Sequence, residues 1–187
     1  PTAEQKPSAT DQATAEQTED INNAVIRLAG NSQDGIQTIG GLLAKLAGRS
    51  AQEVMTYMTI PSTISGGASI FQVRIGSGEV LSPGDEADFL VAFYQESYEN
   101  HINNLREGGV YLFDSDHVEP DITDKRFTFV GVPMTSTTVE AIGGSARDRG
   151  KNIFALGLLT NLFDLQRDKL VQIIENQFKN KHESVLR

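Results

Sequence analysis

The chain has 187 residues, 16 of them basic and 25 acidic, so it carries a formal net charge of −9 at neutral pH. This charge argues against a nucleic-acid binder, because binding phosphates requires a basic stripe. The chain contains no cysteine, which excludes disulfides, thiolate zinc sites, cysteine nucleophiles and cysteine-held iron–sulfur clusters.

Residues 1–20 are expected to form a disordered acidic tail. Apart from proline, alanine is their only apolar residue, and one lysine stands against five acidic side chains. Such a segment cannot offset the entropy of ordering, so a single folded domain is expected over residues 21–187. No secretory signal is visible, and the longest nearly apolar stretch, residues 153–163, is far shorter than the roughly 20 residues of a membrane-spanning helix. We therefore expect a cytoplasmic protein without membrane contact.

The first predicted strand covers residues 24–29, a nearly continuous apolar run that ends at Gly30. Such a run suits a strand that is buried on both faces of a parallel sheet. A helix is predicted next, because apolar residues then recur at helical spacing up to Gly48. These residues are Ile36, Ile39, Leu42, Leu43 and Leu46.

Three strands are predicted in the middle of the chain. Residues 54–58 alternate between the two faces and stop before Pro61. Residues 71–75 also alternate, which suits a strand with one wet face that lies near the sheet edge or runs antiparallel. Residues 89–93 form an uninterrupted apolar run, typical of a buried strand.

The second half of the chain carries two further strands and three helices. Strands are predicted at residues 110–113 and 127–132, and helices at about residues 96–106, at residues 152–163 and around Leu170, Ile174 and Phe178. The first of these helices is expected to end at Gly108-Gly109. Strands that alternate with helices predict an α/β fold, with a Rossmann-like, mostly parallel (mixed) sheet and helices on both faces.

Ligands of open α/β sheets gather at the carboxyl ends of the strands. Residues 30–35 lead from the first strand into a helix N-terminus, where N–H groups and the helix dipole favour an anion such as a phosphate. The spacing fits neither a P-loop nor a dinucleotide fingerprint. A ligand-binding loop and a plain tight turn are both open. The candidate cofactor-binding residues are Gly30, Asn31, Ser32, Gln33, Asp34 and Gly35.

A second candidate loop, residues 61–69, is rich in hydroxyl groups and glycine. Backbone can approach a ligand or another subunit closely there, and the segment is too long for a hairpin turn. A binding or docking role and a flexible connection are both open. The candidate cofactor-binding residues of this loop are Ser65, Gly66, Gly67 and Ser69.

No catalytic or metal-binding set is predicted. Residues 114–117, Asp-Ser-Asp-His, resemble a hard-metal or acid–base cluster, but acidic residues at strand ends are common turn formers and helix caps. His101 lies among Asn and Glu residues of a predicted helix and is expected to be solvated. The basic run at residues 147–151 suits a solvated linker or a contact with a phosphate-bearing ligand.

Several segments stand in a characteristic order and spacing. They are Gly30-Asn31-Ser32-Gln33-Asp34-Gly35, Ser65-Gly66-Gly67-Ala68-Ser69-Ile70-Phe71-Gln72-Val73-Arg74, Pro83-Gly84-Asp85-Glu86-Ala87-Asp88 and Lys151-Asn152-Ile153-Phe154-Ala155-Leu156-Gly157. Together they resemble the gamma domain of 2-oxoacid:ferredoxin oxidoreductases, and most closely the N-terminal part of fused alpha subunits of the 2-oxoglutarate type.

This resemblance implies a component of an enzyme that converts a 2-oxoacid and coenzyme A to an acyl-CoA, carbon dioxide and reduced ferredoxin. It implies that the domain closes over coenzyme A, contacts other subunits and is inactive alone. Thiamine diphosphate, magnesium and the iron–sulfur clusters then belong to partner domains or subunits. Many family members have glutamine followed by glycine after a glycine-rich first loop, whereas this chain has Gln33-Asp34-Gly35. The Asp34 carboxylate would repel a phosphate if it pointed inward.

A stand-alone flavodoxin-like or receiver-like ligand-binding module is the alternative. Both share the alternation of strands and helices. A receiver domain needs an acidic pair after its first strand, where this chain has Ala29-Gly30. A flavodoxin would place Ser and Thr where this chain has Gln33-Asp34.

Overall fold

A computed structural model describes residues 23–31, 35–50, 52–61, 67–142 and 150–178 of the chain. The tail predicted at residues 1–20 lies outside the described residues. The elements run in the order β1 (Asn23–Asn31), α1 (Ile36–Arg49), β2 (Glu53–Thr59), β3 (Ala68–Gly76), β4 (Ala87–Ala92), α2 (Gln95–His101), a short 3₁₀ helix (Ile102–Asn104), β5 (Leu105–Asp114), β6 (Thr128–Val132), α3 (Met134–Ile142), α4 (Lys151–Leu162) and α5 (Arg167–Phe178).

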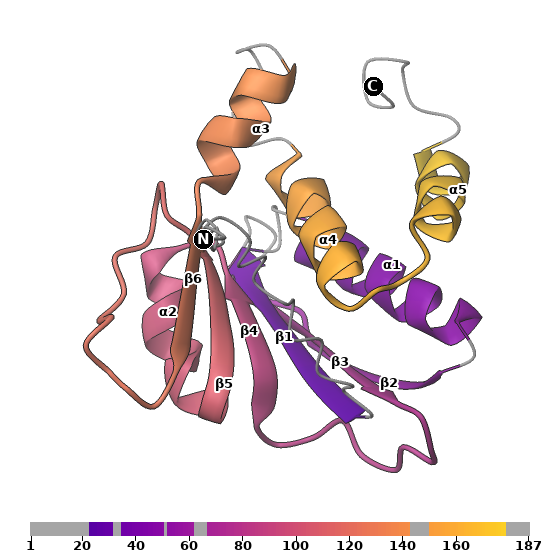
Figure 1. Cartoon of the computed structure of the whole chain (residues 1–187), viewed down its shortest axis with the longest axis horizontal. Helices are drawn as coiled ribbons and strands as arrows, with labels where there is room; N and C mark the ends of the chain where they lie inside the picture. Colours follow the sequence, from indigo (N-terminus) through magenta and orange to yellow (C-terminus); the bar gives the residue numbers. More distant parts are fainter. Residues whose placement is uncertain (1–22, 32–34, 51, 62–66, 143–149, 179–187) are drawn as a thin grey trace, which may run out of the picture.

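The strands form one mixed sheet in the order β2-β3-β1-β4-β5-β6. β1, β4, β5 and β6 run parallel, whereas β3 runs antiparallel to both β1 and β2. α1, α4 and α5 pack on one face, and α2 packs on the other (Figure 1). The predicted α/β fold is therefore confirmed. None of the helices that the structure describes has the length and apolar character needed to cross a membrane.

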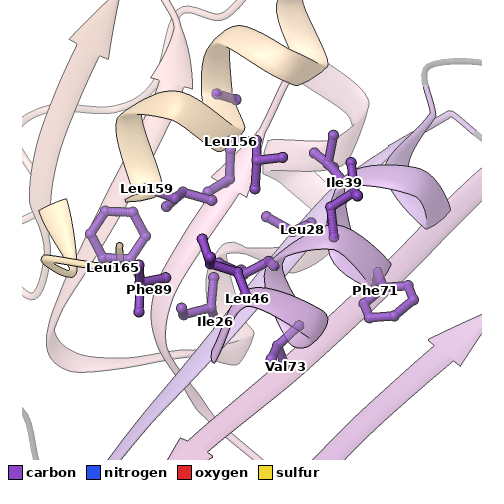
Figure 2. Packing of buried hydrophobic residues seen from close by; sticks show 14 of the residues in the cluster. Ile26, Leu28, Ile39, Leu46, Phe71, Val73, Phe89, Leu156, Leu159 and Leu165 are labelled. Carbon is purple, nitrogen blue, oxygen red and sulfur yellow. The ribbon is translucent and has the colours of Figure 1, made fainter. Parts of the chain in front are cut away.

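The main hydrophobic core lies between the sheet and the three helices of one face (Figure 2). Ile26 and Leu28 of β1 contribute to it and are fully buried, whereas Val25 and Ala29 belong to the core on the opposite face. Successive side chains of a strand point to opposite faces, so a continuous apolar run in β1 fills both cores. This explains why β1 lies in the middle of the sheet.

The helix predicted at residues 96–106 is wrong in its second part. α2 ends at His101, and β5 begins at Leu105. Gly108 has a φ of 75° and donates its N–H to the Arg126 carbonyl at 2.7 Å, and the register between β4 and β5 shifts in the same region. The glycine pair at residues 108–109 therefore forms an irregularity inside a strand, not the end of a helix.

The strand face of residues 71–75 that was expected to be exposed to solvent is covered by the segment before β4. Gln72 is only 1% exposed. Its side-chain amide donates to the carbonyls of Pro83 and Gly84 at 2.7 and 2.6 Å, and its Oε1 accepts from Arg27 Nε at 2.7 Å. The segment before β4 thus buries a polar side chain whose hydrogen bonds are satisfied.

The sequence patterns do not predict α3. Its sequence is rich in β-branched residues, which lowers its helix propensity. Its first N–H groups are instead bound by distant carboxylates: Asp114 accepts from Met134 N at 3.0 Å, and Asp116 accepts from Ser136 N at 2.7 Å. The helix-cap interpretation of residues 114–117 is therefore confirmed.

Two adjacent glycines of α1 provide a matched test of its packing on the sheet. A Cβ on Gly40 would collide with the Phe71 ring of β3, whereas a Cβ on Gly41 would meet open space. We expect Gly40→Ala to lower the free energy of unfolding by about 1–3 kcal/mol through overpacking. Gly41→Ala should raise it by about 0.5–1 kcal/mol, because alanine is the better helix former. Urea unfolding measures both changes, and effects of the same sign would contradict the close approach of α1 to β3.

Candidate functional site

β1 and β4 are adjacent parallel strands whose following helices lie on opposite faces of the sheet. Figure 1 shows α1, which follows β1, on one side and α2, which follows β4, on the other. In open α/β sheets such a divergence leaves a crevice at the carboxyl ends of the two strands, where ligands bind. The topology therefore places the candidate site at the ends of β1 and β4.

A pocket of about 220 Å³ opens at this crevice. Its walls come from the end of β1, the start of β3 and the segment that runs from β4 into α2. The lining residues are Gly30, Asn31, Ala68, Tyr94, Glu96, Ser97, Asn100 and His101. Polar groups from segments far apart in the sequence therefore share one small cavity.

The described ends of the two loops predicted from the sequence meet at the same edge of the sheet. Gly30 of β1 is paired with Ser69 of β3. Gln37, in the first turn of α1, donates from Nε2 to Ser69 Oγ at 2.7 Å, and Ser69 donates to the Thr59 carbonyl at 3.1 Å. Ser69 is 1% exposed, so its hydroxyl stabilises the junction of α1, β2 and β3.

The predicted cofactor-binding residues fall into two groups. Gly30, Asn31, Gly35, Gly67 and Ser69 belong to the described part of the chain; the others, Ser32, Gln33, Asp34, Ser65 and Gly66, lie outside the described residues. Gly30 and Asn31 line the pocket, Gly35 precedes α1 and Gly67 precedes β3. Sequence reasoning missed the contribution of α2, whose polar residues carry no motif.

Two of the predicted glycines are also required by packing. A Cβ on Gly30 would lie 3.0 Å from Ile36 Cδ1 and 3.2 Å from the Phe93 ring. Gly35 has a φ of 73°, in the left-handed region that favours glycine, and a Cβ there would collide with the side chain of Asn152. These glycines allow α1 to begin close to both β4 and α4.

The N-termini of α1 and α4 approach each other beside the crevice, since Asn152 in the first turn of α4 lies against Gly35. The cap residues, Gly35 and Gly150, are both glycines in the left-handed conformation and have no capping side chain. Neither helix carries an acidic residue in its first turn. The positive ends of two helix dipoles therefore converge, which favours an anion.

Lys151 and Asp114 form a buried pair at the same edge of the sheet. Lys151 is 1% exposed and Asp114 is fully buried, with Nζ and Oδ2 3.9 Å apart. Lys151 Nζ also donates to the Tyr94 hydroxyl at 3.1 Å. The expectation that Lys151 is solvated is therefore wrong, because its ammonium is bound inside the fold. Arg147 and Arg149 lie outside the described residues.

His101 is partly buried, which contradicts the expectation of a solvated side chain. Burial lowers the pKa of its imidazole; a hydrogen bond with Asn104 acts in the opposite direction, and the charge of Arg27 adds to the lowering. The imidazole is therefore neutral at neutral pH. In the described part of the chain, no group of three or more His, Asp or Glu side chains is placed to hold a metal ion.

The family model for pyruvate ferredoxin/flavodoxin oxidoreductases matches residues 25–187. The chain belongs to this family. The family relationship predicted from the quoted segments is thus confirmed, and it outweighs the flavodoxin-like and receiver-like alternatives.

Relatives of known type agree with this assignment. The 2-oxoglutarate oxidoreductase subunit KorA of Mycobacterium tuberculosis is 32% identical over 192 residues, which cover 87% of this chain and 29% of KorA. The 2-oxoglutarate synthase subunit KorC of Methanocaldococcus jannaschii is 30% identical over 143 residues, which cover 75% of each chain. The chain thus spans less than a third of the length of KorA but most of the length of KorC.

A solved structure of the family has the same fold. It is the 2-oxoglutarate:ferredoxin oxidoreductase from Magnetococcus marinus with 2-oxoglutarate, coenzyme A and succinyl-CoA bound. The match has a TM-score of 0.79 at 31% identity and covers 89% of this chain and 29% of that chain.

The burial of Lys151 against Asp114 predicts that replacing Lys151 lowers the free energy of unfolding far more than replacing an exposed lysine does. Lys151→Met is expected to lower the free energy of unfolding by about 3 kcal/mol, because Asp114 then keeps a buried charge without its cationic partner. Lys125→Met, at an exposed position, should change it by less than about 0.5 kcal/mol. Chemical denaturation of both variants measures the difference. A small effect at both positions would show that the pair does not stabilise the fold.

The lowered pKa of His101 predicts a pH dependence of stability. Between its folded pKa and the ordinary value of 6.5, the imidazole binds fewer protons in the folded chain than in the unfolded chain. The stability that His101 contributes is therefore fully present above that ordinary value, and it is lost as the pH falls toward and through the pKa of the folded state. His101→Gln should remove this component, so the Tm difference between the chain and the variant should change between about pH 7.5 and pH 5. A constant difference would contradict the lowered pKa.

Proposed function

We propose that the chain forms the gamma-type domain, residues 21–187, of a 2-oxoacid:ferredoxin oxidoreductase. The whole enzyme converts a 2-oxoacid and coenzyme A to an acyl-CoA, carbon dioxide and reduced ferredoxin. Family membership supports this reaction class. The names of KorA, KorC and the Magnetococcus marinus enzyme support 2-oxoglutarate as the 2-oxoacid.

Within that enzyme, the domain contributes contacts to coenzyme A and to other subunits. The observation that carries this proposal is the pocket at the divergence of α1 and α2, beside the converging N-termini of α1 and α4. The diphosphate suits the two helix N-termini, and the pocket accepts an adjoining part of the coenzyme. Gly30, Asn31, Gly35 and Gly67 are the described residues proposed to contact it, and Ser69 holds them in place through Gln37.

The redox groups belong elsewhere in this proposal. The chain has no cysteine, so an iron–sulfur cluster held by thiolates does not fit it. Thiamine diphosphate with its magnesium, and the clusters that pass electrons to ferredoxin, are assigned to partner domains or subunits. The isolated chain is therefore not expected to oxidise a 2-oxoacid.

A charge placed at the rim of the pocket tests the role in coenzyme binding. Ala68 is exposed and lines the pocket. In the assembled enzyme, Ala68→Asp is expected to raise the KM for coenzyme A about 3- to 10-fold, because a carboxylate near the crevice repels the phosphates. The KM for the 2-oxoacid, which reacts elsewhere, should stay within about twofold.

Thr56→Asp is the matched control, since Thr56 is an exposed position of the edge strand β2 and does not line the pocket. This variant should leave both KM values unchanged. An unchanged KM for coenzyme A in Ala68→Asp, with the fold shown intact by circular dichroism, would leave the domain with a purely structural role.

A further inference from the structure

We propose that the pocket between α2 and the end of β1 holds the uncharged pantetheine arm of coenzyme A, while the phosphates remain outside it. The inference rests on the proposed function and assigns one part of the coenzyme to one described cavity. It follows from the charge, the hydrogen-bonding groups and the size of that cavity.

The lining of the pocket is unsuited to an anion. Of the described residues that line it, Glu96 carries a negative charge, and none is a lysine or an arginine. His101, the remaining titratable base, has a pKa lowered by burial and is neutral at neutral pH. A phosphate moved into the pocket from water would lose hydration and meet a carboxylate.

The two cationic side chains near the pocket, Lys151 and Arg27, already have partners within the fold. Lys151 donates from Nζ to the Tyr94 hydroxyl at 3.1 Å, and the same Nζ lies 3.9 Å from Asp114 Oδ2. Arg27, whose charge acts on His101, donates to Gln72 Oε1 at 2.7 Å. Neither side chain lines the pocket, so neither supplies the countercharge that a phosphate would need there.

The polar groups of the lining suit amides. Ser97, Asn100 and His101 follow the i, i+3, i+4 spacing that places helical side chains on one face. Their hydroxyl, carboxamide and neutral imidazole provide both donors and acceptors. Pantetheine has amide and hydroxyl groups joined by short alkyl segments, and the Tyr94 ring offers those segments an apolar wall.

The size of the pocket also indicates a partial occupant. Its volume of about 220 Å³ lies below the roughly 300–1,000 Å³ of cavities that enclose drug-sized ligands. Coenzyme A as a whole is larger than such ligands. The cavity therefore accommodates a segment of the coenzyme, and the lining chemistry selects the uncharged segment.

The test separates the two halves of the coenzyme. The isotope-labelled 187-residue chain is titrated with pantetheine and, separately, with 3′-phosphoadenosine 5′-diphosphate, and backbone amide signals are followed by NMR. Pantetheine is expected to shift the signals of Gly30, Ala68 and Asn100, and the nucleotide is not. Asn100→Leu should weaken pantetheine binding roughly 3- to 10-fold, as for the loss of a hydrogen bond. Asn103→Leu, at an exposed position outside the pocket, should leave binding unchanged.

Other outcomes overturn the inference in distinguishable ways. If the nucleotide shifts these signals and pantetheine does not, the pocket takes the charged half, and the role in coenzyme binding stands without this assignment. Equal losses in Asn100→Leu and Asn103→Leu would show that the effect does not come from the pocket. If coenzyme A itself shifts no signal at millimolar concentration and the Ala68→Asp enzyme has an unchanged KM for coenzyme A, both proposals fail.

Discussion

The carboxylate of Asp114 organises the carboxyl edge of the sheet. It lies fully buried at the end of β5 and accepts hydrogen bonds from the N–H groups of Met134 and Thr135, where α3 begins. Its other oxygen lies 3.9 Å from Nζ of Lys151, the first residue of α4. A buried charge is unfavourable without partners, so β5, α3 and the start of α4 are held in one arrangement.

The position of the candidate site depends on this arrangement. Lys151 binds the hydroxyl of Tyr94, which lines the pocket, and the next residue, Asn152, lies against Gly35 at the start of α1. The first turn of α4 therefore touches both sides of the crevice between β1 and β4. The buried ion pair in this way helps to set the distance between the pocket wall and the helix N-termini.

Local sequence patterns predicted the elements whose causes are local. The apolar run of β1 and the helical spacing in α1 each identify an element, because burial of its own side chains stabilises it. α3 was missed because its caps come from Asp114 and Asp116, about twenty residues earlier in the chain. The predicted end of α2 is wrong because a glycine pair such as Gly108-Gly109 is typical both of the end of a helix and of an irregularity inside a strand. Glycine and strand-end rules pointed to Gly30 and Asn31, which line the pocket. The contribution of α2 depends on β4 lying beside β1, which no local pattern encodes.

The electrostatic difference between the two sides of the crevice follows from how its helices begin. α1 and α4 start at glycines, carry no acidic residue in the first turn and direct their positive ends toward the crevice from one face. α2, on the other face, is only 7 residues long and has Glu96 in its first turn, so its weaker dipole meets a carboxylate. One side of the crevice is therefore suited to anions and the other to neutral polar groups. A ligand with a charged half and an uncharged half therefore has only one orientation across the ends of β1 and β4 that satisfies both sides.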